Sequence, residues 1–130
     1  MARLALLFGA INGFLAVALG AFGAHGLQKA TFLGEGAERA KRLEWWATAG
    51  DYQMWHALLL VGVAALALRL GEEKSLKVAT WATTVGILLF SGSLYVMTLT
   101  GIKVLGAVTP FGGMSMLVGW GAVLWASRKI

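Results

Sequence analysis

The sequence predicts an all-α integral membrane protein, with four transmembrane helices in a compact bundle and an amphipathic interfacial helix between the first two. Hydrophobic residues make up 58% of the 130 residues and charged residues only 13%, and the mean hydropathy is +0.75. A soluble domain carries about 25% charged residues, and a chain this short cannot bury so much apolar surface in its own core. Lipid must therefore be part of the solvent of this single domain, residues 1–130.

Four long uncharged stretches mark the membrane spans. They lie between Arg3 and His25, Asp51 and Arg69, Lys77 and Lys103, and Lys103 and Arg128. Each reaches or approaches the roughly 17–25 residues that cross a bilayer as a helix. We expect these helices at about 4–25, 53–70, 76–98 and 108–127.

The first stretch could instead be a signal peptide, because Arg3 precedes it and Ala21, Phe22 and Gly23 form a tolerable cleavage triplet. The apolar region of a signal peptide is about 7–15 residues long, and this stretch is longer. It also carries regularly spaced small residues, which are typical of a packed membrane helix. We therefore expect a retained first span.

Residues 26–51 form the only sizeable polar segment, and we expect an amphipathic helix there that lies flat on the membrane. Its small and apolar residues recur at helical spacing and form one stripe, made by Ala37, Ala40, Leu43 and Ala47. Most of its charged residues fall off that stripe, namely Glu38, Arg39, Lys41 and Arg42. Trp45 and Trp46 have the character of interface residues, and Gly50 is a plausible stop. A solvated helical loop anchored by the two tryptophans is the alternative.

Small residues at steps of three and four predict close helix packing. The first span places Gly9, Gly13, Ala16, Gly20 and Gly23 on one line, the third offers Ala79, Ala82, Gly86 and Ser93, and the last has Gly112, Ser115, Gly119, Ala122 and Ala126. We expect helix contacts at Gly9, Gly13, Gly20, Gly86, Gly112 and Gly119. The pattern does not separate contacts within a subunit from contacts between subunits.

The antiparallel order of the spans brings most polar residues to the membrane face that carries the long loop. The expected cluster contains His25, Tyr52, Gln53, His56, Ser91, Ser93, Tyr95, Thr98 and Thr109, with Asn12 the main polar residue in the opposite half. Polar groups at membrane depth are costly unless they are paired. The cluster is therefore either a hydrogen-bonded plug or a site for a small ligand, a lipid headgroup, a quinone or a proton.

Sharper chemistry at this cluster has little support in the residues. His25 and His56 could approach each other and bind haem or share a proton. A metal would need further ligands, and only Asp51 and Glu44 are near in sequence. The two serines lack a nucleophile-elbow context and an acid partner, and the absence of cysteine excludes thiol chemistry. We expect no enzyme, no metal and no cofactor.

Ion-coupled transport also has little support. A coupled transporter normally carries an ionisable residue at membrane depth. None of the four expected spans contains Asp or Glu there. This counts against proton-coupled export, although not against uncoupled permeation.

The net charge of +5 arises in short segments between apolar runs, where cations lie among lipid headgroups. We therefore expect no nucleic-acid partner. An even number of spans puts both termini on one side, with Arg3, Arg69, Lys74, Lys77, Arg128 and Lys129 there and Lys29, Arg39, Lys41, Arg42 and Lys103 opposite. The two sides carry nearly equal numbers of basic residues, so the positive-inside rule gives little guidance. Our expectation is that the termini are cytoplasmic.

Four motifs carry a family resemblance: GAFGAHGL, YQMWHALLL, FSGSLYVMTLTG and TPFGGMSMLVGW. Together they resemble domain-of-unknown-function family 423. Its bacterial members are uncharacterised inner-membrane proteins, and its eukaryotic relative, transmembrane protein 256, is associated with mitochondria. The resemblance covers almost the whole chain and implies a multi-pass protein of the bacterial inner membrane with about four helices. It implies no established activity, so it carries over no catalytic residues.

These observations favour a non-enzymatic structural or accessory subunit in the lipid bilayer. It would be a homo-oligomer, or would join a membrane-protein partner, through the small-residue seams. The alternative is a small-molecule, lipid or quinone binding or permeation protein that uses the polar cluster. The structural hypothesis expects the polar atoms to be paired within the chain. The site hypothesis expects an enclosed cavity near His25, His56 and Tyr95.

Overall fold

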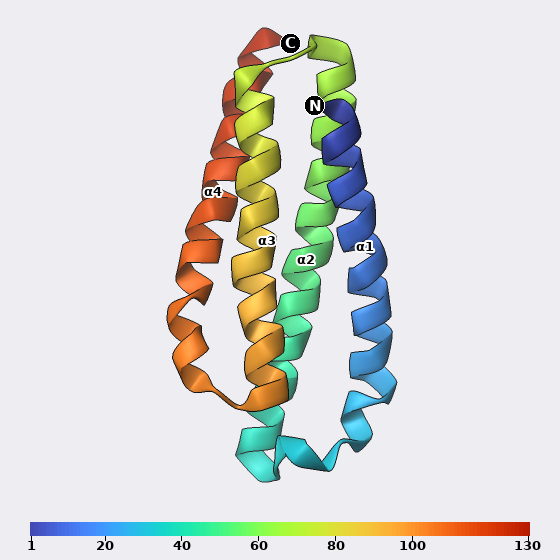
Figure 1. Ribbon diagram of the computed structural model, residues 1–130, viewed down its shortest axis with the longest axis vertical. Coiled ribbons are helices and arrows are strands. Elements are labelled where there is room, and N and C mark those ends of the chain that lie inside the picture. Colours follow the sequence, from blue (N-terminus) through green and yellow to red (C-terminus); the bar gives the residue numbers. More distant parts are fainter.

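Four long helices account for most of the chain in the computed structural model, which describes all residues from Met1 to Ile130 (Figure 1). They are α1 (Ala2–His25), α2 (Gly36–Leu70), α3 (Lys74–Thr100) and α4 (Thr109–Ala126). Short 3-10 turns occupy Leu27–Lys29, Thr31–Leu33, Lys103–Ala107 and Ser127–Lys129. The chain has no strands, and four helical segments are long and apolar enough to cross a membrane. The expected all-α class with four spans is therefore confirmed.

Helix α2 is the main departure from expectation. Residues 36–51 form no separate interfacial helix, because they continue without a break into the second span, and Gly50 lies inside the helix instead of ending it. This segment is rich in good helix formers, and one internal glycine costs only about 1 kcal/mol. Side chains on its first half also bind α1 and α3, which holds it upright. The 35-residue helix is about 52 Å long, well beyond the ~30 Å apolar core of a bilayer.

Two arginines of α2 hold the loop that joins α1 to α2. Arg39 donates hydrogen bonds to the carbonyl oxygens of Ala30, at 2.6 Å, and Gln28. Arg42 Nη1 donates to the carbonyl oxygen of Phe32 at 3.1 Å. Both residues were expected off the apolar stripe of an interfacial helix, but they satisfy backbone carbonyl groups that have no helical partner.

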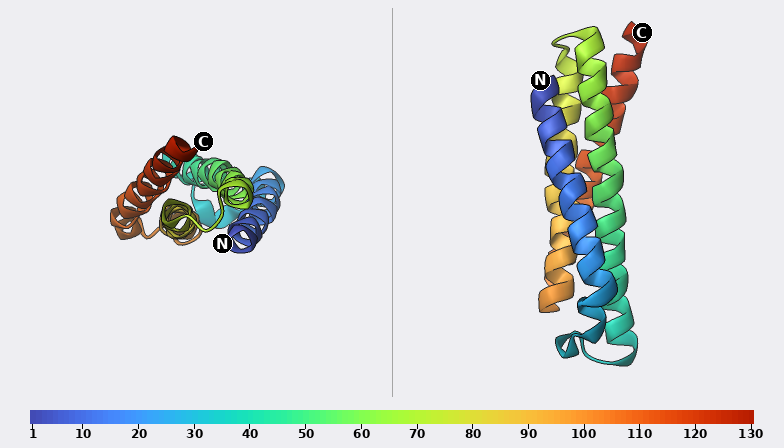
Figure 2. Two further views of the ribbon diagram at one scale, coloured as in Figure 1. Left: turned by 90° about the horizontal axis from the view of Figure 1, so that it is seen from above. Right: turned by 90° about the vertical axis from the view of Figure 1, so that its right-hand side faces the viewer.

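Each helix packs mainly against its neighbours in sequence: α1 against α2, α2 against α3, and α3 against α4. Viewed along the helices, the four follow an open arc with α1 and α4 at its ends (Figure 2). The protein is thus two antiparallel hairpins, α1–α2 and α3–α4, which meet along α2 and α3.

Glycines make the closest approaches in the first hairpin. A Cβ atom on Gly9 would lie 2.9 Å from the carbonyl oxygen of Ala57, and one on Gly23 would lie 2.5 Å from Trp46 Nε1. Gly13 has only an ordinary contact, and Gly20 faces open space. The expected seam on α1 therefore contacts α2 at its two ends and is loose between them.

In the second hairpin, the backbones of α3 and α4 approach each other more closely than those of α1 and α2. A Cβ atom on Gly112 would collide with the backbone of Phe90, and one on Gly119 with the Thr83 hydroxyl. Gly86 faces Met116 in the same way, at 2.6 Å from its Cγ. These small residues therefore serve packing within the chain.

The two termini lie at the same end of the molecule, beside the loop that joins α2 to α3 (Figure 1). The amino terminus of Met1 pairs with Glu72 at 2.7 Å, and Lys129 pairs with Glu73 at 2.6 Å. The α2–α3 loop therefore contacts both chain ends. Their position at one end of the molecule is what an even number of membrane crossings requires.

The outer surface is strongly apolar. Only 32 of the 130 residues are buried, and large hydrophobic side chains such as Phe14, Leu68 and Leu124 are 75%, 81% and 73% exposed. A surface of this kind is compatible with lipid and not with water. The largest internal cluster consists mainly of alanines near the terminal end of the helices.

Candidate functional site

The two histidines do not meet. His25 ends α1 and is exposed, whereas His56 is buried on α2. Gly9 lies against Ala57, the residue after His56, so the histidines are separated by roughly 24 Å along the helix axis at about 1.5 Å per residue. This follows from the early start of α2 at Gly36, which carries residue 56 far from the loop. The geometry excludes a haem or a proton shared by the pair.

Gln53 is the centre of a polar contact between α1, α2 and α3. Its Nε2 donates to Asn12 Oδ1 at 3.3 Å, and its Oε1 accepts a hydrogen bond from the Tyr95 hydroxyl at 2.8 Å. Asn12 also donates to the carbonyl oxygen of Phe8 at 2.9 Å. These three side chains satisfy one another within the chain, as polar groups at membrane depth must.

His56 uses both of its ring nitrogens. Its Nδ1 lies 2.7 Å from the carbonyl oxygen of Tyr52, and its Nε2 lies 3.2 Å from Trp120 Nε1. A carbonyl oxygen only accepts, so Nδ1 carries the proton and Nε2 accepts the indole N–H. The Tyr52 ring stacks on Phe90, with ring centroids 4.4 Å apart. A neutral imidazole thus links α2 to α4 and is surrounded by the aromatic rings of Tyr52 and Trp120.

The serine and threonine hydroxyl groups of the expected cluster also have partners within the chain. Ser91 Oγ donates to the carbonyl oxygen of Ala49 at 2.8 Å, and the hydroxyl groups of Ser93 and Thr109 share a hydrogen bond of 2.7 Å. Neither serine is hydrogen-bonded to a side-chain base, which a serine nucleophile requires. Thr83 Oγ1 is the one buried side-chain polar atom without a partner. No group of three or more His, Cys, Asp or Glu side chains could hold a metal ion.

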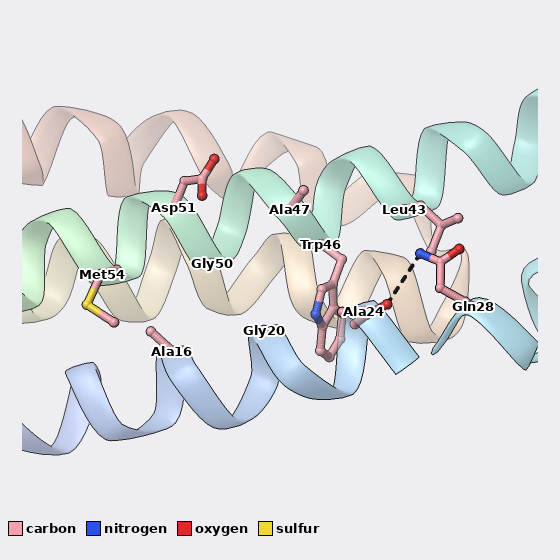
Figure 3. Close-up of a pocket in the computed structure, with 11 residues that line it drawn as sticks. Ala16, Gly20, Ala24, Gln28, Leu43, Trp46, Ala47, Gly50, Asp51 and Met54 are labelled. Carbon is pink, nitrogen blue, oxygen red and sulfur yellow. Dashed lines mark hydrogen bonds between the residues drawn. The ribbon is translucent and has the colours of Figure 1, made fainter. Parts of the chain in front are cut away.

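Two grooves open on the outside of the helices. The His56 groove has a volume of about 560 Å³ and is lined by Tyr52, Trp55, His56, Phe90, Gly113, Met116, Leu117 and Trp120. The Asp51 groove has a volume of about 410 Å³ and lies between α1 and α2 (Figure 3). Its lining includes Ala16, Gly20, Gly23 and Ala24 of α1 and Trp46 and Asp51 of α2. Neither groove includes His25 or Tyr95, so the expected cavity that would join them to His56 is not found.

Sequence reasoning missed four residues that make the main polar contacts: Asn12, Arg42, Trp46 and Trp120. Trp46, expected at the membrane interface, is 5% exposed, and its Nε1 donates to the carbonyl oxygen of Leu19 at 2.9 Å. Arg42 is also buried and bonds to α3. The step of three from Gly20 to Gly23 could have indicated a close helix approach at Gly23, but nothing local identifies the partner side chain.

The fold and these contacts define a small multi-pass α-helical membrane protein in which the side chains of Asn12, Gln53, His56 and Tyr95 have partners within the chain. The chain belongs to the family described as protein of unknown function (DUF423), which matches residues 19–113.

Curated relatives match over nearly their full length. The chain is 46% identical to the UPF0382 membrane protein YwdK of Bacillus subtilis, with 95% of each chain covered. It is 38% identical to the UPF0382 inner membrane protein YgdD of Escherichia coli, over 98% of this chain and 92% of the relative. A UPF0382 membrane protein of Haemophilus influenzae is 41% identical, over 92% and 90%. No solved structure matches the chain.

Proposed function

We propose that this protein is a non-enzymatic structural or accessory component of the membrane. The observation that carries the proposal is the internal pairing of the polar side chains that join the helices. Gln53, Tyr95 and Asn12 bond to one another, and His56 bonds to Trp120. A catalytic or transport site would need some of these groups free to meet a substrate, whereas a plug that locks helices uses them all.

Assembly with further helices is part of this proposal. Small residues let membrane helices approach closely, and four glycines in the interiors of the long helices remain outside the contacts within the chain. Gly20, Gly62, Gly92 and Gly121 have no atom within 4 Å of where a Cβ atom would lie. We assign these free positions to contacts with a second copy of the chain or with a partner membrane protein.

Native mass spectrometry of the detergent-purified protein tests this role. We expect an oligomer, and we expect Gly→Leu at one of the four free positions to reduce it to monomer without unfolding. Gly106→Leu, in the loop between α3 and α4, is a control. A wild-type protein that is monomeric and brings no partner from the membrane would contradict the proposal. Loss of a bound ligand from a folded His56→Ala variant would also count against it.

The His56 groove supports a second candidate, in which the protein binds a lipid or a quinone. Four aromatic rings and one imidazole line this groove, and ligand sites typically combine such apolar lining with a few polar groups. Organic extraction of the purified protein, followed by mass spectrometry, should then recover a stoichiometric lipid or quinone. Trp120→Ala should lose it, and recovery equal to that of Trp125→Ala would argue against this candidate.

We further propose an inner-membrane location with cytoplasmic termini. The relative from Escherichia coli is named an inner membrane protein. Of the five basic residues on the loop side, Arg39 and Arg42 are tied to backbone carbonyl groups, which leaves fewer free cations there than at the termini. Fluorescent and periplasmic reporter fusions at each terminus should both report the cytoplasm, and activity of a periplasmic reporter at either terminus would reverse the assignment.

A further inference from the structure

The His56 groove lies near the middle of the bilayer. Phe90, which lines it, is midway along the uncharged run of α3, and Trp120 is less than one helical turn from the midpoint of α4. The Tyr52 ring stacks on Phe90, so α2 contributes to the groove at the same depth. The apolar core of a bilayer is ~30 Å thick, and the headgroups are therefore about 15 Å away on either side.

Tyr52 brings an unpaired hydroxyl group to this groove. Of the two tyrosines in the chain, Tyr95 donates to Gln53 at 2.8 Å. The backbone carbonyl of Tyr52 is bonded to His56, but the Tyr52 hydroxyl has no hydrogen-bond partner within the chain. It is also not enclosed by protein, because Thr83 Oγ1 is the one buried side-chain polar atom without a partner. The hydroxyl therefore reaches the outside of the helices, at a depth where a polar group without a partner is costly.

The rest of the lining restricts what could satisfy this hydroxyl. His56 and Trp120 are bonded to each other, and no charged side chain lines the groove. A charged ligand would therefore find no counter-ion at this depth. A phospholipid is also a poor fit, because its ester carbonyls lie outside the apolar core, about 15 Å from the hydroxyl. The groove thus calls for an uncharged, apolar molecule that carries a hydrogen-bond acceptor.

We propose that the His56 groove binds the ring of a membrane quinone. This inference rests on the second candidate function and names its ligand. A quinone ring is flat and uncharged, and one of its carbonyl oxygens accepts the hydrogen bond of the Tyr52 hydroxyl. The aromatic rings of Tyr52, Trp55, Phe90 and Trp120 line the groove and offer stacking contacts to the quinone ring. The groove volume of about 560 Å³ lies within the roughly 300–1,000 Å³ typical of ligand pockets.

Two probes of similar shape separate the hydrogen bond from apolar partition. Menadione is a naphthoquinone, and methylnaphthalene has the same fused rings without carbonyl oxygens. Binding of each probe to the full-length protein in mild detergent is measured by isothermal titration, with empty micelles as the blank. We expect saturable binding of menadione, tighter than that of methylnaphthalene by about threefold to tenfold. The chain has no cysteine that could react with the quinone ring.

Tyr52→Phe removes the hydroxyl and keeps the aromatic ring. It should weaken the binding of menadione to the level of methylnaphthalene and leave the binding of methylnaphthalene unchanged. Tyr95→Phe is the matched control, because it removes the other tyrosine hydroxyl, which lies outside the groove. This control should keep the tighter binding of menadione.

Gly113→Leu provides a second, independent arm. A Cβ atom on Gly113 would make only an ordinary contact with Phe90, at 3.7 Å, so a side chain there fills the groove without a collision. Both probes should lose binding, and the melting temperature should stay near that of the wild type. Leu124→Phe adds bulk to the same helix outside the groove, and this control should bind both probes.

Equal binding of the two probes by the wild type, or tighter binding of menadione that Tyr52→Phe leaves intact, overturns the inference. If menadione does not bind and organic extraction recovers a stoichiometric phospholipid, the quinone is wrong and the His56 groove remains a lipid site. If neither probe binds and nothing is recovered, the second candidate function fails as well and the structural role stands.

Discussion

Arg42 and Thr98 bond to each other twice. Arg42 Nε donates to the carbonyl oxygen of Thr98 at 2.8 Å, and the Thr98 hydroxyl donates to the carbonyl oxygen of Arg42 at 2.9 Å. The pair joins the first half of α2 to the last turn of α3, where carbonyl groups lack helical donors. It keeps the early part of α2 upright along the bundle instead of flat on the membrane.

Replacing Arg42 should therefore destabilise the protein. Arg42→Lys cannot reproduce the directed Nε and Nη1 bonds to Thr98 and Phe32, and we expect a loss of about 2 kcal/mol or more. Thermal unfolding in detergent measures the effect. Lys41→Ala, on an exposed neighbouring position, should change little; an equal loss in both variants would contradict this account.

Gly23 should tolerate no side chain. A Cβ atom there would lie 2.5 Å from Trp46 Nε1, so Gly23→Ala must displace the indole and break its bond to Leu19. We expect a loss of about 1–3 kcal/mol. Gly20→Ala, three residues earlier and facing open space, should be neutral or slightly stabilising. Comparing the two melting temperatures tests the contact.

Gly112 controls the approach of α4 to α3. Gly112→Ala would place a methyl group against the backbone of Phe90, and because backbone cannot rotate away, the two helices must separate. We expect a larger loss than for Gly23→Ala, of about 3 kcal/mol. Gly121→Ala is the control on the same helix, since its Cβ position is empty. A disulfide-trapping assay between α3 and α4 would also show the displacement.

The Tyr95–Gln53 hydrogen bond should be worth little by itself. Bonds between membrane helices average about 0.6 kcal/mol and reach about 1.7 kcal/mol in double-mutant cycles. A cycle of Tyr95→Phe and Gln53→Leu should give a coupling energy in this range. A coupling energy near zero would mean that the contact of 2.8 Å does not form in the membrane.

Acid should weaken the tie between the amino terminus and Glu72. Hydrogen bonds from the terminal amine and from Lys77 lower the pKa of Glu72 below its ordinary value. Because the pKa of Glu72 is lower in the folded protein, its ionised carboxylate stabilises the fold at pH values above the ordinary pKa of glutamate. That contribution is lost as the pH falls through the lowered pKa of the folded state. Between about pH 6 and about pH 3, the wild type should therefore lose stability more steeply than Glu72→Gln. The effect should be small and should shrink with salt, because Glu72 is exposed.

The fold class could be predicted because it depends on local composition. Four long uncharged stretches separated by charged segments predict four membrane crossings, whatever the contacts between the helices. Gly9, Gly86, Gly112 and Gly119 were also expected at helix contacts and lie there, because spacing along one helix shows which residues share a face.

The polar contacts could not be predicted, because they depend on the register between helices. The start of the second helix was placed at residue 53 on the basis of charge, whereas α2 starts at Gly36. This difference moves His56 away from His25 and puts Asp51 inside the long helix α2. It also brings Asn12, expected in the opposite half, into contact with Gln53. One misplaced helix end thus altered the expected polar pairings of α2.

The division into two hairpins has a consequence for synthesis. Each hairpin contains its own closest glycine contacts, Gly9 and Gly23 in the first and Gly112 and Gly119 in the second. The first can therefore pack as soon as α2 has entered the bilayer, while α3 is still being translated. Nascent chains truncated after Gly71 should already protect the Trp46 indole from aqueous quenchers, so the order of translation and the order of packing coincide.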